Sequence, residues 1–430
     1  MAASPRIPRF GSATGHRDLF RVAWKNVFRN RRRSALNIIA LTVGITIMVL
    51  GLGWVQGYYT YIFTAVQEFN TGHAQVLNER YLAEAPRLPV DVTVPRYQTT
   101  RALIDGHPGV LDVSGRVNFS LKISAGRTSV RMLAKGVDAR HEAGVTVLDE
   151  YVREGAYLTE QPGILIGAPV AEELGVAPGD TVFVSAMDKY SVRNLLDVRV
   201  AGIFDFGYPA MDENVVFMDL ATASELLSLE NEVSRLVVKL EDGLSPRVSV
   251  EEIAALVRRQ APADEELSVH SWQRFAQTTV HSVRADVSSF YVMLVILYIL
   301  TVLGILNSMS MSVRERTGEI GTLRAIGIRR SRIVLLFLYE AVSIALMAGA
   351  ISVLVSLPVA GYLQLVGVDV GTALPADIPV PFGETFRADY RLWHYLLALG
   401  IGAASAAFGA VTPARRAARL NIAEAMSGKR

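Results

Sequence analysis

The side chains that could carry out covalent chemistry show no spacing typical of a catalytic or metal site. His141-Glu142 begins like the zinc-protease motif HExxH, but Val145 stands where the second His belongs. The only Gly-Lys pair is Gly428-Lys429, beside the C-terminal arginine, so the sequence contains no P-loop for ATP. Cysteines and a Gly-x-Ser-x-Gly elbow are also absent. The pattern favours a binding or mechanical role over catalysis, with no cofactor and no metal bound by this chain.

Glu340 is the one charged residue inside a long apolar run. A carboxylate buried in hydrocarbon is costly unless it is paired, so this residue marks a functional or structural site. Alternatively, it lies near the headgroups and is wetted from the cytoplasmic side. The sequence names no partner for it.

Four apolar runs are long enough to cross a membrane. They cover residues 36–57, 287–313, 333–365 and 392–411. A helix needs about 20 residues to cross a hydrocarbon core of roughly 30 Å. The first run follows a basic arm, residues 1–35, that is too long for the head of a cleavable signal peptide. With 51% hydrophobic and 20% charged residues, the chain combines membrane and soluble parts.

Basic residues gather in three clusters on one side of the predicted spans. The clusters are Arg21, Lys25, Arg29, Arg31, Arg32 and Arg33; Arg314, Arg316, Arg324, Arg329, Arg330 and Arg332; and Arg415, Arg416 and Arg419. The opposite edges, residues 58–67 and 364–370, lack basic residues. By the positive-inside rule both termini are cytoplasmic. The net charge of +2 gives no reason to expect a nucleic-acid partner.

This topology predicts a membrane protein with four transmembrane α-helices and a large α+β extracytoplasmic domain inserted between helices 1 and 2. The predicted segments are a cytoplasmic basic amphipathic segment (1–35), helix 1 (36–63), the inserted domain (64–284), helix 2 with a stalk (285–313), a cytoplasmic coupling helix (314–332), helix 3 (333–365), an extracytoplasmic loop (366–391), helix 4 (392–413) and a cytoplasmic tail (414–430).

The inserted residues alternate strand and helix patterns. Strands are predicted at 129–137, 181–185, 197–204, 214–218 and 235–240, and helices at 169–174, 222–227 and 250–260. The order of these elements would allow two lobes, one near residues 97–148 together with the C-terminal helix region of the domain, and another near residues 157–229. Helical stalks are expected at 58–69 and 271–289, tying the inserted domain to the membrane helices.

The loop between spans two and three, RERTGEIGTLRAIGIRRSR (residues 314–332), reads as a short amphipathic helix. Its apolar stripe contains Ile320, Leu323, Ile326 and Gly327. Such a helix would lie at the membrane surface and be presented to a cytoplasmic partner, or be held by lipid alone.

Small residues recur four positions apart in two spans. Span four contains the pairs Gly402/Ala406 and Ser405/Gly409, and span one contains Gly53/Gly57. These pairs allow close helix packing, either between subunits or within one.

Several stretches of this sequence resemble the FtsX/MacB-type ABC transporter permeases, the type VII or mechanotransmission group. The resemblance lies in NSMSMSVRERTGEIGTLRAIG (307–327) with FLYEA (337–341), in PARRAARLNIAEAM (413–426), in AWKNVFRNRRRS (23–34), and in ILIGAPVAEELGVAPGD (164–180) with VAGIF (200–204) in the inserted domain. It therefore covers essentially the whole chain.

The resemblance implies a permease dimer, identical or paralogous, with two copies of an ABC ATPase that bind ATP and Mg. Closure of the ATPases would move the membrane helices, the stalks and the extracytoplasmic domains. The implied ATPase contact is Glu315, Arg316, Glu319, Leu323, Arg324 and Gly327, while Pro413 and Arg415 would end span four at the cytoplasmic surface.

TGHAQV (71–76) is similar to the lipoprotein-releasing, LolC/LolE-like branch of this family. That branch implies extraction of lipoproteins from the outer leaflet of the bacterial inner membrane, with membrane lipid, lipoprotein and a periplasmic chaperone or adaptor as partners. Outward residues of spans one and two would line the cavity or simply face lipid: Val43, Ile47, Leu50, Trp54, Tyr58, Val292, Ile296 and Ile299. The alternatives are export of a peptide, toxin or drug with an adaptor, and regulation of a cell-wall hydrolase.

Overall fold

The computed structural model describes residues 16–29, 31–158, 162–241, 246–260, 266–369 and 385–419. Contacts divide the chain into a membrane unit and an inserted unit. The membrane unit is Met1–Tyr59, Arg284–Val368 and Phe386–Arg430; the inserted unit is Thr60–Val283 and Asp369–Thr385. The C-terminal tail beyond residue 419 and most of the predicted loop at 366–391 lie outside the described residues.

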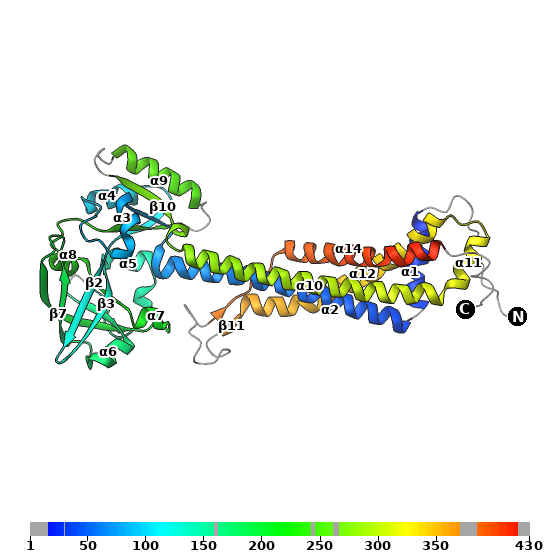
Figure 1. The fold of residues 1–430 in the computed structure, drawn as a ribbon, viewed down its shortest axis with the longest axis horizontal. Coiled ribbons are helices and arrows are strands. Elements are labelled where there is room, and N and C mark those ends of the chain that lie inside the picture. Colours follow the sequence, from blue (N-terminus) through cyan, green and yellow to red (C-terminus); the bar gives the residue numbers. More distant parts are fainter. Residues whose placement is uncertain are drawn as a thin grey trace. The chain divides into compact units, whose positions relative to one another are not determined.

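The membrane unit contains four long apolar helices, as predicted. They are α2 (Arg31–Val66), α10 (Gln277–Glu315), α12 (Arg330–Leu365) and α14 (Leu392–Ala418) (Figure 1). The shorter helix α1 (His16–Arg29) precedes α2, and α11 (Thr317–Ala325) lies between α10 and α12 in the sequence. Both α2 and α10 are longer than a hydrocarbon core requires, because a helix rises about 1.5 Å per residue. Their extra turns are the predicted stalks.

Two predicted helix ends are wrong. The second stalk does not reach Ser271, which belongs to a strand and is followed by the 3-10 turn Trp272–Arg274. In the membrane unit, Pro413 does not end the helix of span four, because α14 continues through it to Ala418. Pro413 is itself buried, and the next turn packs Ala414 and Ala417 against Ile333 and Phe337 of α12. The helix continues because packing of small side chains offsets the hydrogen bond that proline removes.

Close helix contacts in the membrane unit are made at glycines and small polar residues. A Cβ at Gly402 of α14 would lie 2.6 Å from Ile45 of α2, and one at Gly409 would lie 3.0 Å from Ile305 of α10. Thr42 donates to the Ala348 carbonyl at 3.3 Å, and Thr46 lies 3.0 Å from the Ser352 hydroxyl. The small-residue pairs therefore pack helices within one subunit.

The inserted unit is built on a ten-stranded sheet with the order β10-β1-β9-β2-β3-β8-β5-β7-β4, while β6 pairs with β2 and β7. The strands are β1 (Ala74–Asn78), β2 (Val110–Ala125), β3 (Thr128–Val137), β4 (Val152–Gly155), β5 (Ile164–Gly167), β6 (Thr181–Met187), β7 (Arg193–Phe204), β8 (Val215–Asp219), β9 (Arg235–Leu240) and β10 (Leu267–Ser271). Its helices are α3 (Glu79–Glu84), α4 (Tyr97–Asp105), α5 (Ala139–Val145), α6 (Ala168–Leu174), α7 (Pro209–Asp212), α8 (Leu220–Leu227) and α9 (Pro246–Gln260). All five predicted strands and three predicted helices are confirmed.

The two parts suggested by the order of elements share this sheet. Strand β3 of the first part pairs in parallel with β8 of the second, from Leu133↔Val215 to Val137↔Asp219. The pairing joins their backbones directly, so the sheet is continuous from one part to the other. The residues suggested as two lobes therefore lie in one compact unit.

Substitution of Gly57 tests the close packing around this part of α2. A Cβ there would lie 2.5 Å from the carbonyl oxygen of Arg387 and 2.6 Å from the Ala388 Cα. Because neither backbone atom can rotate away, Gly57→Ala should destabilise the chain by about 1–3 kcal/mol. Thermal unfolding in detergent measures this. Gly304→Ala on α10 is the matched control: nothing lies within 4 Å of its Cβ position, so alanine should be neutral or stabilising there.

Candidate coupling site

The predicted coupling segment forms a short helix that is closed by a glycine. Helix α11 has nine residues, Thr317–Ala325, because 314–315 belong to α10 and 330–332 to α12. Gly327 has φ +96°, its N–H donates to the Arg324 carbonyl at 3.0 Å, and the Ile328 N–H donates to the Leu323 carbonyl at 3.1 Å. These two bonds form a Schellman motif, whose left-handed residue favours glycine. Gly327 is thus required by the turn itself.

The apolar residues of this segment do not form one stripe, contrary to the prediction. Ile320 is 3% exposed and packs with Val313, Ile333 and Phe337 at the end of the helix bundle. Ile326, in contrast, is 67% exposed, because α11 has already ended at Ala325. One apolar residue therefore seats α11 on its own chain, and the other faces outward.

The six predicted contact residues lie in different environments. Glu315 and Gly327 are exposed, and Leu323 and Arg324 are half-buried. Glu319 is exposed but forms an ion pair with Arg29 of α1. Arg316 is only 7% exposed, so its side chain lies inside the unit and not on the surface with the others.

Arg316 instead forms a buried ion pair with Glu340 of α12. Its Nη1 donates to Glu340 Oε2 at 2.9 Å, and Glu340 is 2% exposed. The pair joins the start of the coupling segment to the third membrane helix. It supplies the partner for Glu340 that the sequence did not name, and it places this carboxylate inside the protein.

The predicted cavity residues lie on the outward sides of α2 and α10. Val43, Ile47, Val292, Ile296 and Ile299 are each 41–59% exposed in this chain. Leu50, Trp54 and Tyr58 are half-buried; the Trp54 ring packs 4.4 Å from Phe386, and Tyr58 donates to Asp286 at 2.9 Å. These outward positions bury little within one subunit.

A separate apolar hollow of about 310 Å³ lies on another side of α2. It is lined by Met48, Leu52, Tyr291, Leu294, Val295, Tyr298, Leu397, Ile401 and Ala404. At 100° per residue, Met48 and Leu52 point well away from Val43 and Ile47. The spacing of Tyr291, Val295 and Tyr298 could have indicated this hollow, which the sequence reasoning missed.

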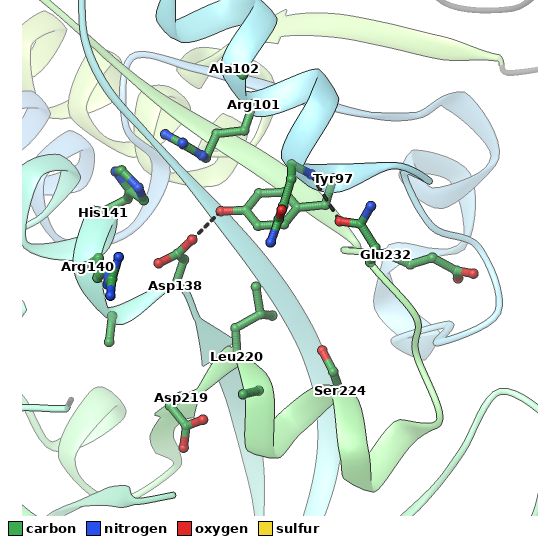
Figure 2. A pocket seen from close by; sticks show the side chains of 14 residues that line it. Tyr97, Arg101, Ala102, Asp138, Arg140, His141, Asp219, Leu220, Ser224 and Glu232 are labelled. Carbon is green, nitrogen blue, oxygen red and sulfur yellow. Dashed lines mark hydrogen bonds between the residues drawn. The ribbon is translucent and has the colours of Figure 1, made fainter. Parts of the chain in front are cut away.

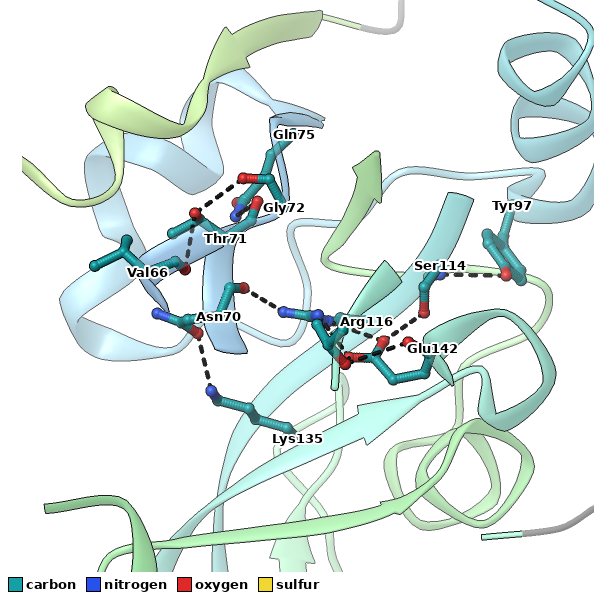
Figure 3. A network of polar contacts seen from close by, with 12 residues as sticks. Val66, Asn70, Thr71, Gly72, Gln75, Tyr97, Ser114, Arg116, Lys135 and Glu142 are labelled. Atoms are coloured by element: carbon teal, nitrogen blue, oxygen red, sulfur yellow. Dashed lines mark hydrogen bonds and ion pairs between the residues drawn. The ribbon is translucent and has the colours of Figure 1, made fainter. Parts of the chain in front are cut away.

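In the inserted unit, the end of α2 is held by two basic side chains of the sheet. After Val66 the helix continues as the π-helical turn Gln67–Thr71. Arg116 of β2 donates to the main-chain oxygen of Asn70, and Lys135 of β3 donates to its side-chain oxygen at 2.9 Å (Figure 3). We call Asn70, Arg116, Lys135 and Glu142 the clamp.

Glu142 orients Arg116 inside the clamp. It accepts from Arg116 at 2.5 and 3.1 Å and from the Ser114 hydroxyl at 2.6 Å, and both charged residues are at most 4% exposed. The paired, two-point contact is the strongest geometry available to a guanidinium. His141 bonds Asp112 at 2.8 Å, so the His-Glu pair seen in the sequence has structural contacts.

Lys135 is buried in the same network, at 5% exposure. Its pKa is lowered to about 7, first because burial disfavours the charged ammonium and second because Arg116 repels it; Glu142 opposes this effect. The clamp thus contains a group that titrates near neutral pH.

A polar pocket of about 800 Å³ lies elsewhere in the inserted unit, between α4, the start of α5 and α8 (Figure 2). The hydroxyl of Tyr97 donates to Asp138 at 2.5 Å, and burial and this bond raise the pKa of Tyr97. Asp219 caps α8, and Glu232 accepts from Thr93 at 2.8 Å. Its carboxylates are already bonded within the domain, which is typical of a structural cleft and not of a catalytic pair.

Breaking the Arg316–Glu340 pair tests its contribution to the membrane unit. Glu340→Ala leaves a buried guanidinium without this carboxylate, so unfolding in detergent should become easier by about 3–5 kcal/mol. The double variant Arg316→Met/Glu340→Leu removes both charges and should recover much of that loss. Equal losses in the single and double variants would contradict a charge-pairing role.

Lys135 should make stability depend on pH. Its folded pKa of about 7 lies below the ordinary value of 10.5, so between these values the unfolded chain binds the extra proton. The free energy of unfolding should therefore rise with pH from about 7 to 10, by up to about 1.4 kcal/mol per pH unit from this group. Denaturant titrations across this range measure the slope, and Lys135→Met should flatten it. A slope unchanged in the variant would refute the assignment.

Two protein-family models match this chain. The MacB-like periplasmic core domain matches residues 34–258, and the FtsX-like permease C-terminal domain matches residues 291–422. The chain is 24% identical over 96% of its length to the macrolide export ATP-binding/permease protein MacB 2 of Aeromonas hydrophila, covering 61% of that protein. It is 20% identical over 90% of its length to the lipoprotein-releasing system transmembrane protein LolE of Haemophilus influenzae, covering 92% of it.

The solved periplasmic region of MacB from Actinobacillus actinomycetemcomitans covers 50% of this chain and 95% of its own length, at 12% identity and a TM-score of 0.38. The model of the MacB-like periplasmic core domain alone spans more than half of the chain. The chain spans about 60% of the length of the macrolide-export relatives it matches. The chain therefore belongs to the ABC transporter permeases that combine a MacB-like periplasmic core domain with an FtsX-like permease region.

Proposed function

We propose that this chain passes the work of ATP hydrolysis from a partner ATPase to its inserted domain, and that this work extracts lipoproteins from a membrane. Two ATPase copies would bind ATP and Mg, and a second permease, identical or paralogous, would complete the transporter. The chain would lie in a bacterial inner membrane with both termini in the cytoplasm and the inserted domain outside.

The exposed part of the coupling segment supports contact with an ATPase. Glu315 is exposed just before α11 begins, and Thr322, Ile326 and Gly327 are exposed near its end. Ile326, 67% exposed, would give the ATPase an apolar side chain to bury on contact. Leu323 and Arg324 would support this surface from their half-buried positions, while Arg316 would act from inside by fixing the start of α11.

The observation that carries the proposal is the unbroken path along α2. One helix runs from Arg31 to Val66, and the turn that follows is bonded to the sheet through Asn70. Because helices and buried ion pairs deform little, displacement of the membrane part of α2 would reach β2 and β3. Such a path suits a transporter that acts on its substrate outside the membrane core.

The apolar surfaces of the membrane unit support lipoprotein as the substrate class. The hollow beside Met48 and Leu52 is lined almost entirely by carbon and would accept part of an acyl chain. The outward residues from Val43 to Ile299 would form the wall of a cavity shared with the second permease. A periplasmic chaperone or adaptor would then receive the released lipoprotein.

The test is ATP hydrolysis by the chain and its ATPase in lipid nanodiscs, with acylated or unacylated lipoprotein. Stimulation by the acylated form alone would support extraction. Ile326→Asp should reduce the stimulated rate about tenfold or more, because an unpaired carboxylate would be buried in the interface. Ile326→Leu is the matched control and should retain the rate.

If hydrolysis is equal with both lipoproteins and still falls in Ile326→Asp, the proposed lipoprotein substrate is wrong, but the proposed coupling surface is retained. Export with an adaptor would then be the better function, which the names of the macrolide-export relatives favour. Hydrolysis indifferent to Ile326→Asp would contradict the coupling surface itself.

A further inference from the structure

Helix α1 presents three parallel stripes with a spacing of four residues. Leu19, Ala23 and Val27 are at most 7% exposed and form the inner stripe. The neighbouring stripe is aromatic, and the third is basic. The aromatic stripe is Phe20, Trp24 and Phe28, and the basic stripe is Arg21, Lys25 and Arg29. Because each step of four residues turns the helix by only about 40°, the stripes stay side by side along α1.

The aromatic stripe is attached to the bundle at one end and open at the other. Phe20 packs on Tyr339 of α12 at 5.9 Å, Trp24 on Phe20 at 6.3 Å, and Phe28 on Trp24 at 6.1 Å. Trp24 is 37% exposed and Phe28 is 49% exposed. Aromatic rings of this kind prefer the boundary between hydrocarbon and water. The exposed rings of Trp24 and Phe28 thus suit such a boundary.

The basic stripe lies beside these rings, and its residues other than Arg29, which pairs with Glu319, have their charges available. Arg17, Arg21 and Lys25 are exposed, and among the residues that the structure describes no carboxylate lies within ion-pair distance of them. Arg31 and Arg32, exposed at the start of α2, add to the same positive charge. A second copy of α1 would be repelled by this stripe, whereas a surface of phosphate groups would be attracted.

We propose that α1 binds the headgroups of anionic phospholipids through Arg21 and Lys25, with Trp24 and Phe28 at the hydrocarbon boundary. The binding site is a lipid surface, and its ligand class is a phosphodiester with a net negative charge. Helices with this division of aromatic and basic stripes lie in the interfacial plane of a membrane.

The same helix holds the coupling segment, so lipid binding reaches that segment. Arg29 ends the basic stripe and pairs with Glu319 of α11, next to the buried Ile320. An α1 seated on anionic lipid keeps Arg29 in place for Glu319; an unseated α1 lets this exposed, weak pair open. Anionic lipid is therefore a positive regulator of coupling. This second part rests on the proposed function, while lipid binding by α1 does not.

Quenching of Trp24 by brominated lipid tests the binding site directly in the full chain. The chain is placed in phosphatidylcholine nanodiscs that carry a fixed small fraction of either brominated phosphatidylglycerol or brominated phosphatidylcholine. Trp24→Phe supplies the background of the other three tryptophans. Phosphatidylglycerol should quench Trp24 about twofold or more better, and Arg21→Gln/Lys25→Gln should bring the ratio near one, since each basic residue adds roughly a fivefold preference for an anionic surface.

Arg415→Gln/Arg416→Gln is the matched control, because it removes two exposed charges from the end of α14 and leaves α1 intact. This control should keep the phosphatidylglycerol preference. Equal quenching by both lipids in the native chain, or the same loss in both double variants, would overturn the binding site.

ATP hydrolysis of the assembled transporter tests the regulatory part. Replacing a phosphatidylcholine/phosphatidylglycerol mixture by phosphatidylcholine alone should lower the coupled rate several-fold, and Arg21→Gln/Lys25→Gln should remove this lipid dependence. A rate equal in both lipids would overturn regulation by anionic lipid. Absence of coupled hydrolysis in every lipid would count against the proposed function, and the quenching ratio would still decide lipid binding.

Discussion

Arg116 brings a guanidinium into the interior of the inserted domain, where a charge without a partner would cost several kcal/mol. Glu142 neutralises it with two bonds, and the remaining nitrogen donates to the carbonyl of Asn70. That carbonyl ends a helix and needs a donor, because the last carbonyls of a helix have none within it. The buried charge and the open helix end therefore satisfy each other, and Lys135 adds a second bond between this end and the sheet.

The membrane unit uses ion pairs of two kinds. Arg316–Glu340 is buried, so separating it leaves charges in a medium of low polarity, and it fixes α11 at its start. Arg29–Glu319 is exposed, and such pairs contribute about 0–1 kcal/mol. Helix α11 is thus firmly held where it leaves α10 and weakly held by α1. The position of α11 therefore depends on α1 through an exposed pair that opens more easily than the buried one.

Features that follow from one segment of sequence could be predicted, and features that join distant segments could not. The four spans follow from the length of uninterrupted apolar runs, and β6 and β7 follow from alternation. Strand β5 is buried on both faces, so it has no alternation to detect. Arg316 and Glu340 are 24 residues apart on different helices, and nothing in their spacing connects them. The stripe through Ile326 failed for a local reason: the turn at Gly327 ends α11 at Ala325, one residue before Ile326.

Helix α2 is packed against other helices on one side and exposed on the other. Thr42 and Thr46 bond it to α12, and Ile45 packs it on α14. The opposite side, with Val43 and Ile47, is exposed among the residues that the structure describes. In lipid, apolar side chains gain little by leaving hydrocarbon, so these residues do not themselves demand a protein partner. Hydrogen bonds and close contacts therefore decide which helices move together. Thr42 and Thr46 thus tie α2 to α12, the helix whose Glu340 holds the start of the coupling segment through Arg316.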